Sequence, residues 1–378
     1  MTKGLILSGG WGTRLRPLTC TIPKTLIPVG NIPVIERQIL LLKEAGVKEI
    51  VLAVSVMADF LRAYFEHEEK LKGLKIHFTE EKSPMGTAGA LKLAEPYLKD
   101  DKFFMLNGDV ILNFNFKWML DAHEKFGGVG TIASKMVEDP SRYGVLITNK
   151  ETHQIFEFQE KEKYEPEEHP EKEVPINAGV YLLEPKVFSY IQPHKKLSIE
   201  RDTFPKLVKN EKLFYYPIEG IWKDIGKPYE LLEGNILLMK DILKKLDGKR
   251  NLIEESANVD GSVKIIPPVT IGENSVIRNN CIIGPNVIIG NDVYVEKNTK
   301  IQNSLIYNEV YISQNSEIEK SIISDNCHIR KGAKLKGNNE SLVILASFVE
   351  VMENIELNAF ENGDLSFCHH EVVKESLK

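Results

Sequence analysis

The sequence predicts an α/β fold in two successive parts, a mostly parallel sheet covered by helices and then a parallel β-helix. In roughly the first 237 residues, short apolar runs alternate with segments of helical periodicity, which is the pattern of a sheet covered on both faces. Beyond Gly248 an apolar residue recurs every six residues, and this period is typical of hexapeptide β-helix repeats.

In the first part, strands and helices alternate along the chain. We expect a strand at 4–8, a helix at 34–45, a strand at 49–55, a helix at 58–72, a strand at 74–80, a helix at 87–98 and a strand at 103–107. Ligands of such sheets bind beyond the carboxyl ends of the strands. Gly9 and Asp109 stand just after two of these ends, so both are candidate site residues.

The second part follows a helical connector, which we expect at 235–246. An apolar residue recurs every six positions, and this period shortens by one residue at two places, after Ile301 and after Ile318. The repeating residues are Ile265, Ile271, Ile277, Ile283, Ile289, Val295, Ile301, then Ile306, Ile312, Ile318, then Ile323, Ile329 and Leu335. Three hexads make one triangular coil, so roughly four coils fit this stretch. The tail from Ser341 has no clean hexad and is expected to form a last irregular coil or a cap. These limits predict a domain at 1–237, a linker at 238–250 and a β-helix domain at 251–378.

The composition is that of an ordinary globular protein with room for two domains, 27% charged and 42% hydrophobic over 378 residues. The net charge of −6 argues against a nucleic-acid partner, because polyanion binding needs a basic face. No apolar run approaches the ~20 residues of a membrane span, and no signal-peptide pattern opens the chain. Four distant cysteines without CxxC spacing favour reduced thiols and a cytoplasmic location.

The strongest chemical signal is the stretch GGWGTRLRPLT at 9–19, which follows the first strand. Its three glycines allow a sharp turn and a close approach of the backbone to a ligand. Arg14, Arg16 and Lys24 add positive charge, so the loop is suited to hold a polyphosphate. It matches neither the GxGxxG nor the Walker pattern, which excludes the usual dinucleotide and P-loop interpretations.

Six further motifs follow in a fixed order. They are PMGTAG (84–89), LNGD (106–109), YGV (143–145), FQEK (158–161), INAG (176–179) and WKDIG (222–226). With the glycine-rich loop, they make the chain resemble the sugar-nucleotide pyrophosphorylases, which are nucleotidyltransferases acting on sugar 1-phosphates. The resemblance covers most of residues 1–237, and the hexapeptide part matches the two-domain members. It implies a Rossmann-like domain with a mixed, mostly parallel sheet, followed by a left-handed β-helix.

The family's reaction explains the residue types. A sugar-phosphate oxygen attacks the α-phosphorus of a nucleoside triphosphate, and pyrophosphate leaves. Both reactants are anions whose approach costs several kcal/mol without cations, so positioning and charge stabilisation dominate. The family uses Mg²⁺, which prefers carboxylates and phosphate oxygens. Asp109 and Asp224 match the family's two metal ligands.

The resemblance also assigns the cations. Arg14 should hold the β- and γ-phosphates, and Lys24 should neutralise charge near the α-phosphate. Lys161 should hold the sugar phosphate, although this chain lacks the usual Glu-Lys-Pro, so Lys163 is an alternative. Arg16 suits a salt bridge as well as a phosphate contact.

The remaining assignments concern the base and the sugar. Nucleotide-binding positions are implied at Leu7, Gly9, Gly10, Gly12, Thr13, Gly86, Thr87 and Gly108, and sugar-binding positions at Gly144, Glu160 and Asn177. Trp11 either packs over the nucleotide or only covers the loop. The branch that the chain resembles most uses GTP and mannose 1-phosphate, and glucose 1-phosphate with UTP, dTTP or ATP stays open.

Two other functions compete with this interpretation. A non-catalytic regulatory subunit of the same fold would tend to lose the charged residues that this chain keeps. An acyltransferase in the β-helix would need a basic residue at a coil interface, and His328 is the histidine of the coils, better explained as a surface residue. Cys368-His369-His370 is likewise better explained as surface than as a metal site. The flat faces of the β-helix suit subunit packing, so we expect a homo-oligomer.

Overall fold

The computed structural model describes residues 1–66, 71–159 and 173–377. They form two compact units. The first unit contains Met1–Trp11, Pro23–Leu26 and Val34–Trp222, and the second contains Gly12–Ile22, Ile27–Pro33 and Lys223–Lys378. Among the described residues, no helix is long and apolar enough to cross a membrane.

A nine-stranded mixed sheet forms the centre of the first unit. Its main path runs β10 (Ile155–Gln159), β9 (Val145–Thr148), β11 (Val174–Leu183), β6 (Phe103–Asn107), β1 (Lys3–Ser8), β4 (Glu49–Val54) and β5 (Lys75–Glu80), and β11 also pairs with β8 (Gly130–Val137), which pairs with β12 (Leu213–Pro217). Strands β6, β1, β4 and β5 are mutually parallel, whereas β11 is antiparallel to β6. The expected mixed, mostly parallel sheet is confirmed.

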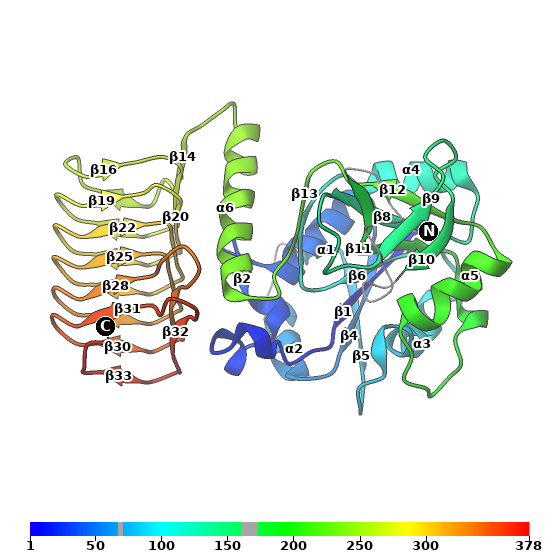
Figure 1. Cartoon of the computed structure of the whole chain (residues 1–378), viewed down its shortest axis with the longest axis horizontal. Coiled ribbons are helices and arrows are strands. Elements are labelled where there is room, and N and C mark those ends of the chain that lie inside the picture. Colours follow the sequence, from blue (N-terminus) through cyan, green and yellow to red (C-terminus); the bar gives the residue numbers. More distant parts are fainter. Residues whose placement is uncertain (67–70, 160–172, 378) are drawn as a thin grey trace. The chain divides into compact units, whose positions relative to one another are not determined.

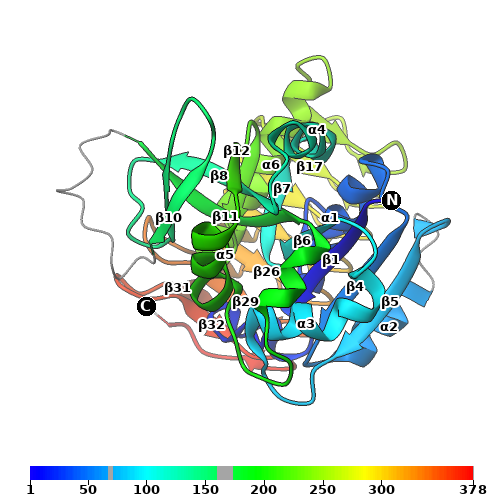
Figure 2. The ribbon, with the colours of Figure 1, turned by 90° about the vertical axis from the view of Figure 1, so that its right-hand side faces the viewer.

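Helices cover both faces of this sheet (Figure 2). On one face, Leu5 of β1 packs in a core with α3 (Gly86–Leu98) and α5 (Phe204–Asn210). On the other face, the next residue, Ile6, packs with α1 (Val34–Glu44), α2 (Ala58–Glu66) and α4 (Phe116–Phe126). Since side chains alternate along a strand, β1 must be apolar at both positions, and each buried leucine or isoleucine stabilises the sheet by about 2 kcal/mol.

The expected strands and helices of this unit are confirmed within one residue at most ends. The helix expected at 58–72 is described only to Glu66, because residues 67–70 lie outside the described part. Residues 160–172 also lie outside the described part, and Lys161 and its alternative Lys163 are among them.

The connector helix of the second unit is longer than expected. Helix α6 spans Pro228–Lys245, with Pro228 in its first turn, where a missing backbone N–H costs nothing. The sequence-based start at 235 was too late because Gly234 interrupts the apolar pattern. Gly234 and Asn235 are both buried, and Asn235 Oδ1 accepts a hydrogen bond from the Gly30 N–H at 2.8 Å, so tertiary contacts carry the helix through the glycine.

Beyond α6 the chain forms stacked triangular coils, drawn from yellow to red in Figure 1. Three parallel sheets of seven, seven and six strands make its faces, consistent with the left-handed β-helix that the resemblance implies. The strands are β14 (Asn251–Ile253), β15 (Asn258–Val259), β16 (Lys264–Ile265), β17 (Val269–Ile271), β18 (Val276–Ile277), β19 (Ile282–Ile283), β20 (Val287–Ile289), β21 (Tyr294–Val295), β22 (Lys300–Gln302), β23 (Ser304–Ile306), β24 (Tyr311–Ile312), β25 (Glu317–Glu319), β26 (Ser321–Ile323), β27 (His328–Ile329), β28 (Lys334–Lys336), β29 (Val343–Leu345), β30 (Glu350–Val351), β31 (Glu356–Asn358), β32 (Leu365–Phe367) and β33 (Val372–Val373).

The phase slips of the hexads are taken up in the turns. Ile271 pairs with Ile289 and Ile289 with Ile306, so the coil from Ile289 to Ile306 is one residue shorter than the coil before it. The turn residues Asn298 and Asn303 both have positive φ, and the omitted residue lies between them. Asparagine tolerates this left-handed conformation, which explains its frequency in the repeats.

The tail from Ser341 continues the β-helix as coils. Leu345 of β29 pairs with Ile323 before it and with Phe367 of β32 after it. The pattern was hard to see because residues 337–342 form an extra loop between β28 and β29, which breaks the six-residue period.

Candidate functional site

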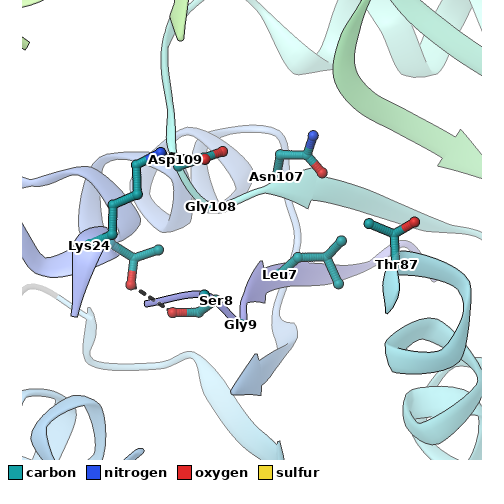
Figure 3. A pocket seen from close by; sticks show the side chains of 10 residues that line it. Leu7, Ser8, Gly9, Lys24, Thr87, Asn107, Gly108 and Asp109 are labelled. Carbon is teal, nitrogen blue, oxygen red and sulfur yellow. Dashed lines mark hydrogen bonds and ion pairs between the residues drawn. The ribbon is translucent and has the colours of Figure 1, made fainter. Parts of the chain in front are cut away.

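Two adjoining pockets open beside the ends of β1 and β6 in the first unit. The smaller, of about 260 Å³, is lined by Leu7, Ser8, Gly9, Gly10, Lys24, Thr25, Thr87, Asn107, Gly108 and Asp109 (Figure 3). The larger, of about 530 Å³, shares Leu7, Gly9, Gly10 and Thr87 and is completed by Trp11, Ala53, Ser55, Val56, Glu81, Lys82, Ser83, Pro84, Gly86, Ala90 and Lys196. Seven expected site residues therefore meet in the smaller pocket, and Gly86 lies in the larger one.

The pairing of two strands places the smaller pocket. Leu7 of β1 lies opposite Asn107 of β6 in parallel register, so the loops that follow leave the sheet side by side. The Gly108 N–H donates to Leu7 O at 2.9 Å. A Cβ at position 108 would lie 2.5 Å from that oxygen, so only glycine allows the two loops to approach this closely.

An ion pair dominates the electrostatics of the smaller pocket. Lys24 Nζ donates to Asp109 Oδ2 at 2.6 Å, and their side chains are 11% and 36% exposed. The segment that carries Lys24 is tied to β1 by a 2.6 Å hydrogen bond between Ser8 Oγ and Thr25 Oγ1. The pocket thus presents a cation, which attracts a phosphate, beside a carboxylate, which attracts the metal cation that accompanies a phosphate.

The larger pocket is bounded by the first turn of α3. Gly86 has φ +72°, and a Cβ there would lie 2.5 Å from Leu197 O, so this turn needs glycine. Glu81 Oε2 accepts a hydrogen bond from the Met85 N–H at 3.1 Å, and burial raises the pKa of its carboxyl group. Trp11 lines the rim of this pocket and is 59% exposed.

The expected sugar-binding residues of the first unit meet at a β-bulge. The register between β11 and β8 shifts between Asn177 and Tyr181, and such a bulge re-aims side chains. The Asn177 N–H donates to Gly144 O at 2.9 Å, which brings these two candidates together. Glu160 lies outside the described residues.

The second unit carries the remaining candidates, Gly12, Thr13, Arg14 and Asp224. Gly12 has a left-handed backbone at the start of a short 3-10 helix, Thr13–Leu15. The Arg14 guanidinium packs on Gly226, because a Cβ on that glycine would lie 3.1 Å from Arg14 Nη1. The glycine-rich loop and the WKDIG motif therefore touch within this unit.

Sequence reasoning missed several pocket residues. Asn107 stands inside the LNGD motif, and Glu81 directly follows the strand expected at 74–80, so both had a signal. Ser8 and Thr25 had none beyond their position beside assigned residues. Lys196 reaches the larger pocket from an exposed loop about a hundred residues further on, where nothing in the sequence marks it.

Asp109 can hold a divalent metal only with additional ligands. Within the described ranges, no group of three or more histidine, cysteine, aspartate or glutamate side chains is arranged to hold an ion. Mg²⁺ is usually held by one or two carboxylates with water and phosphate oxygens. The partly exposed Asp109 carboxylate, which lines the smaller pocket, fits that kind of site.

Comparisons with known proteins match both parts of the chain. Residues 3–241 match the family model described as nucleotidyl transferase, and residues 265–376 match the GMPPB C-terminal domain. The mannose-1-phosphate guanyltransferase of Saccharomyces cerevisiae is 43% identical over 268 residues, which are 70% of this chain and 72% of the yeast protein.

Solved structures also resemble part of this chain. HddC from Yersinia pseudotuberculosis, complexed with GMP-PN, is 28% identical with a TM-score of 0.52, over 62% of this chain and 98% of that one. A putative glucose-1-phosphate thymidylyltransferase from Bacillus anthracis is also 28% identical, with a TM-score of 0.55, over 63% of this chain and 95% of that one. One of these proteins was solved with a guanine nucleotide and the other is described as a thymidylyltransferase. Overall likeness to solved structures therefore does not identify the nucleotide that this chain uses.

Proposed function

This chain belongs to the nucleotidyl transferase family, and from that premise we propose that it makes GDP-mannose and pyrophosphate from GTP and mannose 1-phosphate. The observation that carries the proposal is the Lys24–Asp109 pair in a pocket at the strand ends, in a chain 43% identical to a yeast mannose-1-phosphate guanyltransferase. The enzyme class is therefore nucleotidyltransferase.

The smaller pocket suits the reacting phosphates. Lys24 lines this pocket, and we propose that it neutralises the charge that builds up around the α-phosphorus during attack. Enzymes of this family typically use a divalent metal, and we propose Mg²⁺ held by Asp109 and Asp224. The ion would supply charge neutralisation of the phosphates. Arg14 is proposed to hold the leaving pyrophosphate.

Glu81 favours guanine over uracil and thymine. Guanine presents two donors side by side, its N1–H and its exocyclic NH₂, and an ionised carboxylate is an acceptor-only group that pairs with both. Uracil and thymine offer one N–H between two carbonyl oxygens, which a carboxylate would repel. A half-buried glutamate in the larger pocket therefore supports GTP rather than UTP or dTTP.

The sugar half is proposed to lie around Asn177 and Gly144. The Asn177 amide keeps free hydrogen-bonding capacity after its internal bonds, which suits a sugar hydroxyl. Glu160 and Lys161 keep their expected roles toward the sugar and its phosphate as proposals.

A homo-oligomer formed through the β-helix and a cytoplasmic location also remain proposals. The second unit exposes large apolar side chains at Tyr311, Phe348, Met352 and Val372, which packing between two copies would bury. The four cysteines are all free thiols, which suits a reducing compartment.

A substrate panel tests the proposed reaction. Purified protein is incubated with Mg²⁺ and each combination of GTP, UTP, dTTP or ATP with mannose 1-phosphate or glucose 1-phosphate, and pyrophosphate release is measured. We expect the fastest release with GTP and mannose 1-phosphate. Release only with glucose 1-phosphate would refute the mannose assignment, and no release from any pair would favour the non-catalytic subunit.

A further inference from the structure

One carboxylate, Glu200, connects the pocket turn at Thr87 with the candidate sugar residue Asn177. We propose that Glu200 is a positioning residue that couples the nucleotide subsite to the sugar subsite. This inference rests on the proposed function, because that function assigns the two subsites. Glu200 lies outside all the sequence motifs, in a short π-helix at Ile199–Thr203. Such single π-helical turns are rare and frequently occur at functional sites.

On the nucleotide side, Glu200 holds the first turn of α3. Thr87, which lines both pockets, donates from Oγ1 to Glu200 Oε2 at 2.9 Å. The Ile199 N–H donates to Thr87 Oγ1 at 2.7 Å, so the threonine hydroxyl is fixed as donor and acceptor. Ser198 Oγ also donates to Glu200 Oε2, at 2.6 Å.

On the sugar side, the same carboxylate acts through a buried tyrosine. Tyr181 is fully buried, and its hydroxyl donates to Glu200 Oε1 at 3.0 Å. That hydroxyl accepts from Asn177 Nδ2 at 2.9 Å, and Asn177 Oδ1 accepts from the Gly179 N–H at 3.0 Å. The amide orientation is thereby set, with one N–H and one oxygen lone pair left to meet a sugar hydroxyl.

The direction of these hydrogen bonds requires an acceptor-only group. Three hydroxyls, those of Thr87, Ser198 and Tyr181, all point their protons at Glu200. A glutamine of the same size offers an NH₂ group at one of the two positions, so at least one hydroxyl loses its acceptor or has to reverse. Reversal at Tyr181 would disturb Asn177, and reversal at Thr87 would disturb the first turn of α3.

Backbone hydrogen bonds also join the segment before Glu200 to the start of α3. The Leu197 N–H donates to Met85 O at 2.9 Å, and the Ala88 N–H donates to Leu197 O at 2.9 Å. The segment that carries Glu200 is thus clamped to both sides of Gly86. A shift of Glu200 therefore moves the turn that bounds the larger pocket.

The test compares Glu200→Gln with a matched control. Glu211→Gln is the control, because Glu211 also accepts from a tyrosine hydroxyl, that of Tyr190 at 2.7 Å, and lines neither pocket. We expect Glu200→Gln to raise KM for both GTP and mannose 1-phosphate by about tenfold, with a smaller fall in kcat. Glu211→Gln should have the same KM values and the same kcat as the unsubstituted protein. Circular dichroism should show that all variants are folded.

A second variant separates positioning from general damage. Tyr181→Phe keeps the ring and removes the link to Asn177, so KM for mannose 1-phosphate should rise about tenfold while KM for GTP stays unchanged. When Tyr181→Phe is combined with Glu200→Gln, KM for mannose 1-phosphate should rise little further. Tyr190→Phe is the control for Tyr181→Phe.

The outcomes distinguish this inference from the proposed function. If the unsubstituted protein makes GDP-mannose but Glu200→Gln behaves as Glu211→Gln, or raises only one KM, the coupling role is wrong. If the unsubstituted protein makes no nucleotide sugar, the proposed function fails, and this inference fails with it.

Discussion

Lys24 Nζ lies 2.6 Å from Asp109 Oδ2, and the two residues reach each other from segments 85 positions apart in the chain. The pair is held in place from both sides, by the Ser8–Thr25 hydrogen bond and by the Gly108–Leu7 contact. The cation and the carboxylate are therefore positioned before any phosphate arrives, which is how electrostatic catalysis avoids reorganisation during the reaction.

Removing the charge of Asp109 should abolish turnover without unfolding the protein. We expect Asp109→Asn to lower kcat by about 100-fold or more, because a proposed metal ligand is lost and Lys24 keeps only an amide partner. The melting temperature should change little, since the pair is partly exposed. Pyrophosphate release and a thermal melt measure the two effects. Turnover at the original rate would remove Asp109 from the catalytic machinery.

The approach of the two loops should tolerate no Cβ at position 108. Gly108→Ala should destabilise the fold by about 1–3 kcal/mol and reduce activity, because its Cβ would meet Leu7 O at 2.5 Å and Thr25 Cγ2 at 2.9 Å. Gly10→Ala is the stability control, since a Cβ there meets nothing within 4 Å. Urea unfolding compares the two. Equal midpoints would mean that the loops move apart without cost.

Glu81 should determine the choice of base. Glu81→Gln should reduce kcat/KM for GTP by about 10-fold or more relative to UTP, because the amide cannot accept from both guanine donors. Glu80→Gln is the control, since Glu80 pairs with Arg62 at 3.6 Å and lines neither pocket. Competition between GTP and UTP measures the ratio. An unchanged ratio would exclude Glu81 from base recognition.

The same residue predicts how GTP use depends on pH. Burial raises the pKa of Glu81, so its carboxyl group takes up a proton at a higher pH than an ordinary glutamate. The proposed pairing needs the ionised form, and kcat/KM for GTP should fall as pH falls through this raised pKa. Glu81→Gln should lack that part of the profile. A decline that persists in the variant would have to come from another group.

The sequence predicted the residues that stand at strand ends better than those that reach the site through side-chain contacts. Gly9 and Asp109 stand directly after apolar runs, and Lys24 lies a few residues beyond the glycine-rich stretch, so their positions could be read along the chain. Glu200 acts through Thr87 and Tyr181, which are 113 and 19 positions away, and such contacts leave no periodic signal. The glutamate of SIERD looks like any exposed helical residue.

The β-helix shows the same distinction. Its regular coils could be recognised because every inward residue repeats at six positions. The coils after Ser341 could not, because the loop at 337–342 shifts the register before Val343–Leu345 resumes it. Helix α6 was misjudged at its start because Gly234 opposes helix formation locally and only its burial in the folded protein compensates.

His123 should make stability depend on pH in a predictable direction. It is 2% exposed, with Nδ1 2.8 Å from Thr131 Oγ1 and Nε2 3.3 Å from Glu184 Oε1. Burial lowers its pKa below the ordinary 6.5, despite the opposing effect of Glu184. The unfolded chain therefore binds this proton first, so the free energy of unfolding should fall as pH drops from 6.5 toward the lower folded-state pKa.

A histidine-to-glutamine pair tests this contribution. Urea midpoints at pH 7.5 and at about pH 5.5 are compared for His123→Gln and for His194→Gln, whose histidine is exposed. His123→Gln should be less stable at neutral pH, because packing is lost, and should also lose less stability on acidification. His194→Gln should have the same urea midpoint as the unsubstituted protein at both pH values. If His123→Gln declines with pH as steeply as the unsubstituted protein, the acid sensitivity belongs to other groups.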